Sequence, residues 1–117
     1  MPAPAVIRPS VATVGEAVTP WADASAVPLG ELAARLGVNA VLRTRAIGQG
    51  LIEPAYRTGR GGNGGKVWVT KDDAMRFAAA ALIAARKALP FLTVLALLVA
   101  VGAAYGRAGE FTIKIPD

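Results

Sequence analysis

The feature of this 117-residue chain that most limits its fold is a pair of short helical patterns joined at Gly37. Apolar residues recur at helical spacing before that glycine, at Leu29, Leu32, Ala33 and Leu36. Pro28 suits the first turn of this helix, because its missing N–H would have no helical acceptor there. Gly37 suits a left-handed helix end, and Val38 is placed to enter the core. Asn39 is a good N-cap for a second helix, which we expect to extend to about Gln49.

A glycine-rich hairpin is expected after the second helix, which Gly50 ends. The segments Ala55–Arg57 and Lys66–Val69 indicate paired strands, and five of the eight residues in 58–65 are glycine. A tip that lacks Cβ atoms can lie close to a phosphate backbone. The alternative is a hairpin end that is merely flexible. The glycines do not form a phosphate-binding P-loop, because no Gly-Lys-Ser/Thr sequence ends the run before a helix.

The positive charge of the chain is concentrated in this same region. Residues 39–71 contain one acid, Glu53, and six basic residues, for a net charge of +5, which equals that of the whole chain. The basic residues are Arg43, Arg45, Arg57, Arg60, Lys66 and Lys71. A basic cluster of this kind, and a pI near 10.3, indicate an anionic partner.

A longer helix is expected after the hairpin and completes a domain predicted over residues 27–87. Thr70 and Asp73 form a variant of the capping box, and the acids Asp72 and Asp73 lie near the positive end of the helix dipole. One face of this helix is apolar and should cover the first two helices. Its residues are Ala74, Phe77, Ala78, Ala81, Leu82, Ala85 and Leu89.

Residues 1–26 have the composition of an extended N-terminal arm without a core of its own. Prolines at positions 2, 4, 9 and 20 favour an extended chain. Trp21 is the large anchor that would fasten the arm to the domain. The alternative is an arm that enters the minor groove of DNA, for which Arg8 supplies the charge.

Enzymatic chemistry is not expected of this chain. It contains no cysteine and no histidine, which removes thiol nucleophiles, the commonest general base and the commonest metal ligands. The neighbouring acids Asp72 and Asp73 point in different directions on a helix. We therefore predict no catalytic residues, no metal site and no cofactor.

Residues 88–117 contain a long uncharged segment and a strand-like tail. The nineteen residues 88–106 carry no charge and have no polar face, so a helix there must be buried all round. Either it crosses a membrane, or it packs against its copy in a homo-oligomer, with Leu95 and Leu98 in the shared core. Pro90 lies near its start, where a proline can separate two helices instead of kinking one. Residues 110–115 alternate like a half-buried strand, which favours the oligomer because a strand needs a partner strand.

Several short motifs resemble the winged-helix group that includes MerR-type regulators and phage excisionase-like proteins. They are residues 30–34 (Gly-Glu-Leu-Ala-Ala), 36–38 (Leu-Gly-Val), 50–52 (Gly-Leu-Ile) with Pro54, and 67–70 (Val-Trp-Val-Thr). The resemblance implies that the helix from Asn39 enters the major groove and that the hairpin, as a wing, touches flanking phosphate. The pair Leu42-Arg43 comes one position earlier than in the family, and the effector cysteines and long dimerisation helix of its metal sensors are missing.

The expected fold class is mainly α with a small β-hairpin wing: a winged helix-turn-helix, then an apolar C-terminal helix and a terminal strand. The expected function is sequence-specific binding of double-stranded DNA by a homo-oligomer, as a cytoplasmic transcriptional regulator or a phage or mobile-element architectural factor. Arg43 and Arg45 are the candidates for guanine contacts, because a guanidinium can bond O6 and N7 together. Asn39, Thr44 and Gln49 would add base or phosphate contacts, and Arg57, Arg60, Asn63 and Lys66 would position the duplex.

Two other functions are compatible with the sequence. One is a protein anchored in the inner membrane by a single C-terminal transmembrane helix, with its DNA-binding head in the cytoplasm. The other is a structural or assembly protein that uses a winged helix for protein contacts, since fold does not fix function.

Overall fold

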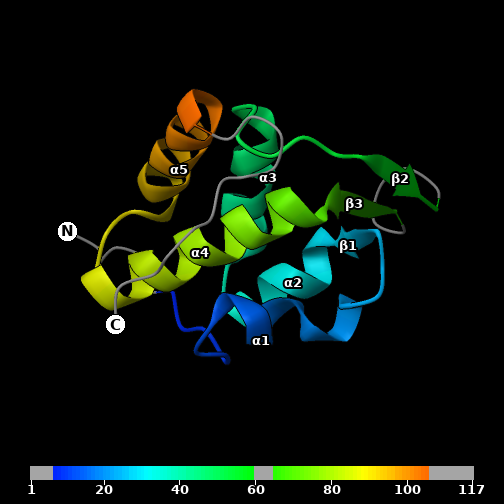
Figure 1. The fold of residues 1–117 in the computed structure, drawn as a ribbon, viewed down its shortest axis with the longest axis horizontal. Coiled ribbons are helices and arrows are strands. Elements are labelled where there is room, and N and C mark those ends of the chain that lie inside the picture. Colours follow the sequence, from blue (N-terminus) through cyan, green and yellow to red (C-terminus); the bar gives the residue numbers. More distant parts are fainter. Residues whose placement is uncertain (1–6, 60–64, 106–117) are drawn as a thin grey trace.

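The computed structural model describes residues 7–59 and 65–105, which form a mainly helical fold with a small antiparallel sheet (Figure 1). In chain order the elements are α1 (Val14–Val18), the 3-10 helix η1 (Thr19–Trp21), β1 (Ala26–Pro28), α2 (Leu29–Leu36), α3 (Ala40–Gly48), β2 (Tyr56–Thr58), β3 (Lys66–Thr70), α4 (Lys71–Lys87) and α5 (Phe91–Tyr105). The coarse fold class expected from the sequence is confirmed. The terminal strand expected at 110–115 lies outside the described residues.

The N-terminal segment is folded from Ile7 onward, which corrects the expected extended arm. Helix α1 begins because the Thr13 hydroxyl accepts a hydrogen bond from the Glu16 N–H at 3.0 Å. Ile7 and Ala17 are buried in the same core as α2 and α4. Trp21 packs against that core and is half-buried, as expected of an anchor. Residues 7–26 are therefore part of the domain, and proline content alone did not reveal their packing.

The α2–turn–α3 unit forms as the sequence predicts. Gly37 ends α2 in the left-handed conformation, with φ 71°. A Cβ at this position would lie 2.6 Å from the Arg8 carbonyl oxygen, so glycine is required for space as well as for φ. Val38 is buried, and the Asn39 side chain caps α3 by accepting a hydrogen bond from the Leu42 N–H at 2.9 Å.

The small sheet has three strands in the order β1-β3-β2, and all its neighbours are antiparallel. The hairpin β2–β3 was predicted, with its strand ends shifted by one residue. Strand β1 was not predicted. It is three residues long and ends at Pro28, immediately before α2, so it is too short to show a period. Pro28 is thus the last strand residue and the N-cap of α2 and not its first helical residue. Proline is tolerated there because β1 is an edge strand.

Helix α4 supplies the centre of the core. Thr70 caps it by accepting a hydrogen bond from the Asp73 N–H at 3.2 Å, as the sequence predicts. Most of its expected apolar face is buried, but Leu89 lies beyond the helix end and is exposed. This face contacts α1 and α2, whereas α3 is packed against α2 and α5. The cover that α4 was expected to give both helices of the turn is therefore clearest over α2.

The uncharged segment 88–106 is not one continuous helix. Ala88 ends α4 in the left-handed conformation, with φ 54°, and α5 begins after Pro90. The inner face of α5 joins the core of the domain, where Phe91 meets Phe77 edge-to-face at 5.0 Å and Leu95 is fully buried. This corrects the expectation that α5 is buried only by another subunit or by lipid. Among the described residues, no helix combines the length and the apolar character that a membrane span requires.

A charged pair lies where α4 meets α5. The Arg76 guanidinium binds the Asp73 carboxylate at 2.9 Å and packs over Gly102 of α5. The Glu53 N–H also donates to Asp73, at 3.4 Å. Burial raises the pKa of the Asp73 carboxyl, although this hydrogen bond and Arg76 act in the opposite direction. The pair therefore connects the segment after α3 with α4 and α5.

Candidate nucleic-acid interface

Helix α3 presents a continuous uncovered face. Ala46 is buried and Leu42 and Ile47 are half-buried against the core, which fixes the rotation of the helix. The positions at spacings of three and four residues on the opposite side are therefore exposed, namely Val41, Thr44, Arg45 and Gly48. A helix that carries an arginine and a threonine in the middle of its exposed face has the groups needed to reach base edges.

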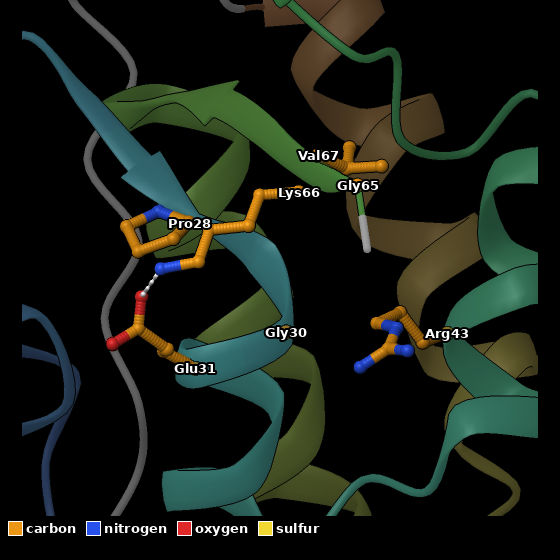
Figure 2. Close-up of a pocket in the computed structure, with 7 residues that line it drawn as sticks. All are labelled: Pro28, Gly30, Glu31, Arg43, Gly65, Lys66 and Val67. Atoms are coloured by element: carbon orange, nitrogen blue, oxygen red, sulfur yellow. Dashed lines mark ion pairs between the residues drawn. The ribbon is translucent and has the colours of Figure 1, made fainter. Parts of the chain in front are cut away.

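Arg43 does not lie on that face. Its guanidinium is directed towards α2, and Nη1 lies 3.1 Å from the position that a Cβ on Gly30 would occupy. Arg43 is half-buried there and lines a pocket between α3, the start of α2 and the hairpin (Figure 2). Gly30 thus leaves the space that the arginine occupies. The sequence grouped Arg43 with Arg45, but the fold directs the two side chains to different places.

The pocket beside Arg43 brings the helical unit and the hairpin together. It is lined by Pro28, Gly30, Glu31, Arg43, Gly65, Lys66 and Val67. Its volume of about 240 Å³ is below the roughly 300–1,000 Å³ of most small-molecule sites. The space therefore suits one charged group, such as a phosphate, better than a whole organic ligand. Figure 2 shows Arg43 and Lys66 on opposite sides of it.

The hairpin is held in register by an aromatic pair. Tyr56 and Trp68 are cross-strand partners, and their rings stack at 5.7 Å. Trp68 Nε1 also donates a hydrogen bond to the Thr58 hydroxyl at 2.8 Å. Every residue of β2 is exposed, including Arg57. An exposed hairpin with a basic strand can serve as a contact surface, and these side chains join its two strands.

Lys66 is the cation that links the hairpin to α2. Its Nζ atom lies 3.5 Å from a carboxylate oxygen of Glu31, and both side chains are more than half exposed. Exposed ion pairs contribute little to stability and are screened by salt. Lys66 can therefore exchange Glu31 for a stronger anion at small cost.

Other basic residues have structural partners. Arg35 donates hydrogen bonds to the Ala17 and Glu16 carbonyls at 3.1 and 2.8 Å, and Arg86 donates to the Ala12 carbonyl at 2.8 Å. Lys71 donates to the Ala22 carbonyl, and Arg76 binds Asp73. By contrast, the α3 and hairpin cations Arg43, Arg45 and Arg57 form no ion pair with any residue that the structure describes. Arg8 and Lys87 form no ion pair within the described part of the chain either, but Arg43, Arg45, Arg57 and the exposed Lys66 make up the largest group of available cations, on α3 and the hairpin.

The remaining sequence candidates have varied positions. Asn39 is exposed, but its side-chain oxygen Oδ1 caps α3 by accepting a hydrogen bond from the Leu42 N–H. Thr44 is on the uncovered face, and Gln49 is exposed at the end of α3. Arg60 and Asn63 lie outside the described residues.

Two residues of this region escaped sequence reasoning. Val41 is 59% exposed on the outer face of α3, and Glu31 is the partner of Lys66. The sequence signal that could have identified Val41 is its position four residues before Arg45, because residues at that spacing share one face of a helix.

No cluster of potential metal ligands occurs in residues 7–59 and 65–105. Comparison of the chain with protein-family models, with curated proteins and with solved structures gave no match. Its function is therefore argued from geometry and charge.

Proposed function

We propose that the chain binds double-stranded DNA as a winged helix-turn-helix protein, with α2 and α3 as the helical unit and β2–β3 as the wing. The observation that carries the proposal is the group of four cations on α3 and the hairpin, which are Arg43, Arg45, Arg57 and Lys66. Of the other described cations, Arg35, Lys71, Arg76 and Arg86 are used inside the fold, and Arg8 and Lys87 lie outside this group. A phosphate backbone is the partner that such a surface fits, because it supplies many anions along one line.

The outer face of α3 is the proposed base-reading surface. Arg45 can bond both O6 and N7 of a guanine, and Thr44 can bond a neighbouring base or phosphate. Val41 fits the C5-methyl group of a thymine, which is an apolar feature of the major groove. An exposed valine beside Thr44 and Arg45 has a role under this proposal that it lacks on a plain solvent-facing helix.

Arg43 and the hairpin are assigned to the DNA backbone. Arg43 faces the pocket at the foot of the hairpin, so we propose a phosphate contact for it instead of the guanine contact expected from the sequence. Arg57 and Lys66 would hold the same strand from the hairpin side. Such contacts fix the register of the protein and carry no sequence information. Backbone contacts of this kind, together with base reading by the α3 face, are what a small regulator or an architectural factor of a mobile element requires.

The test is a salt titration of duplex binding by the full chain. Binding to random duplex should weaken as salt rises, with a slope set by the number of phosphates contacted. The double variant Arg57→Ala plus Lys66→Ala should weaken binding equally on all sequences and reduce the slope by about 2. Lys87→Ala is the matched control, because Lys87 is exposed at the far end of α4.

An unchanged slope in the double variant, or the same change in Lys87→Ala, would show that the hairpin does not touch DNA. Absence of any salt-dependent duplex binding would overturn the proposal. A protein-contact role for the α3 face would then be the better description.

A further inference from the structure

Helix α5 has an inner face that belongs to the core and an outer face that nothing in the described chain covers. Phe91, Val94, Leu95 and Gly102 are buried. The opposite positions recur at spacings of three and four residues and are exposed, namely Thr93, Ala96, Leu97, Ala100 and Val101. Leu97 is 61% exposed and Val101 39% exposed. We call these five residues the α5 outer face.

We propose that the α5 outer face binds the same face of a second copy of this chain, which gives a two-fold dimer that presents two α3 helices to one duplex. The DNA part of this statement rests on the proposed function, whereas the dimer itself does not. A two-fold interface uses the same patch on both subunits, so the patch must be complementary to itself. Leu97 and Val101 can pack between the small residues Ala96 and Ala100 of the partner helix.

Charge favours a second copy as the occupant. Two copies each carry a net charge of +5 and repel one another over most of their surfaces. The residues 88–106 contain no ionisable acid or base apart from Tyr105, so two copies can approach along α5 without opposing like charges.

The arrangement of elements also fits a dimer on DNA. Helix α3 lies between α5 and the β2–β3 hairpin, and α3 is in contact with α5 (Figure 1). Pairing through α5 would therefore put the hairpins at the two outer ends and the α3 helices near the centre. The two α3 helices would be at most about three interhelical distances apart, or roughly 24–30 Å. That is shorter than the ~34 Å that separates successive major grooves on one side of a duplex, so the two copies would contact adjacent grooves of a bent duplex.

The size of the face sets the strength of the dimer. A helix of 15 residues is about 22 Å long. Two such helices bury less than the roughly 800 Å² per partner of a standard interface. The free dimer should therefore dissociate on dilution, and two adjacent half-sites on DNA should reinforce it by raising the effective concentration.

The first experiment is sedimentation equilibrium of the full chain over a wide concentration range without DNA. The wild type should shift from monomer to dimer as concentration rises, and Leu97→Asp plus Val101→Asp should remain monomeric. Met75→Asp is the matched control, because Met75 is an exposed apolar residue on α4. A wild type that is monomeric throughout, or a double variant that dimerises like the wild type, would overturn the dimer. A wild type that stays monomeric and partitions onto neutral phospholipid vesicles would also overturn the dimer.

The second experiment uses duplexes selected by the wild type from a random pool. We expect two half-sites about one helical turn apart, and the double variant should keep single-half-site affinity while losing at least ~10-fold on the pair. A dimer that selects no duplex would contradict the proposed function but leave the dimer standing. Duplex binding that the double variant retains fully on paired half-sites would contradict the two-fold arrangement on DNA.

Discussion

Helices α3 and α5 lie side by side, and each buries one face and leaves the other uncovered, yet the two uncovered faces differ in chemistry. The α3 face contains Thr44 and Arg45, which are donors able to reach into a groove. The α5 outer face is apolar apart from Thr93, and charge is absent from it. Each helix is packed against the core on one side, so side-chain chemistry alone distinguishes their uncovered faces. This difference is why we propose an anion as the partner of α3 and an apolar surface as the partner of α5.

The two inner faces differ in how much of the core they supply. Helix α5 contributes Phe91, Val94 and Leu95 to the buried cluster, whereas α3 contributes only Ala46 as a fully buried residue. Helix α3 is therefore held chiefly by its turn, by the Asn39 cap and by half-buried Leu42 and Ile47. These contacts fix the rotation of α3, so the same outer face is always presented, which suits a reading surface.

The largest expected effect separates the inner and outer faces of α5. Leu95→Asp puts an unpaired carboxylate into the core at a fully buried site, which costs several kcal/mol, on the order of 3–5. We expect the domain to unfold or to lose its cooperative thermal transition. Leu97→Asp, two residues along on the exposed face, should change the free energy of unfolding by less than about 0.5 kcal/mol.

Circular dichroism melts of the two variants check this, in dilute solution where self-association does not contribute. Equal destabilisation by the two substitutions would mean that the rotation of α5 is wrong and that its outer face is not free. The fold also changes the expectation for Leu95, which the sequence placed in an oligomer core where a charge would leave the remainder of the domain intact.

Local signals were sufficient for much of the fold. Gly37, Asn39 and Thr70 end or begin helices through their own backbone and side-chain preferences, and each acts as the sequence predicts. The segments that sequence reasoning misplaced depend on distant partners. Strand β1 exists because β3 lies beside it, and α1 is held by Arg35, eighteen residues from Ala17. Composition could not show either contact.

The candidate interface was predictable by region but not by direction. Counting charges located the basic cluster in residues 39–71, and the structure puts its described members on α3 and the hairpin or beside them. The directions of Arg43 and Arg45 follow from the rotation of α3, which Ala46 sets by being buried. A helix with a weakly apolar inner face gives little periodic signal, so the sequence could not separate the two arginines.

The next effect concerns the α3 face. Arg45→Ala should cost roughly 1–3 kcal/mol on the preferred duplex and much less on random duplex, because the lost contact reads a base. The matched control is Arg35→Ala, which removes the same side chain from a structural position. We expect it to lower the thermal midpoint by breaking the hydrogen bonds to α1 while the sequence preference is kept.

Competition binding with preferred and random duplexes measures the preference directly. If Arg45→Ala weakens both duplexes by the same factor, Arg45 is a phosphate contact and the assignment of the α3 face to base reading is wrong. If Arg35→Ala relaxes sequence preference instead, the reading surface includes the end of α2.

The smallest expected effect concerns the turns that precede the two helices. The turn before α3 contains Gly37 and the turn before α5 contains Ala88, and both residues are left-handed, with φ of 71° and 54°. Left-handed backbone costs a residue with a Cβ about 1–2 kcal/mol. Glycine removes that cost but adds roughly 0.5–1 kcal/mol of chain entropy to the unfolded state. Ala88→Gly should therefore stabilise the domain by between about 0 and about 1.5 kcal/mol. The reverse change, Gly37→Ala, should destabilise it, because the new Cβ would meet the Arg8 backbone at 2.6 Å.

Urea titrations of both variants give the two free energies of unfolding, and the dimer and DNA affinities of Ala88→Gly should match those of the wild type. A loss of stability in Ala88→Gly would mean that Ala88 does not hold the left-handed conformation, and the position of α5 beside α3 would then be in question.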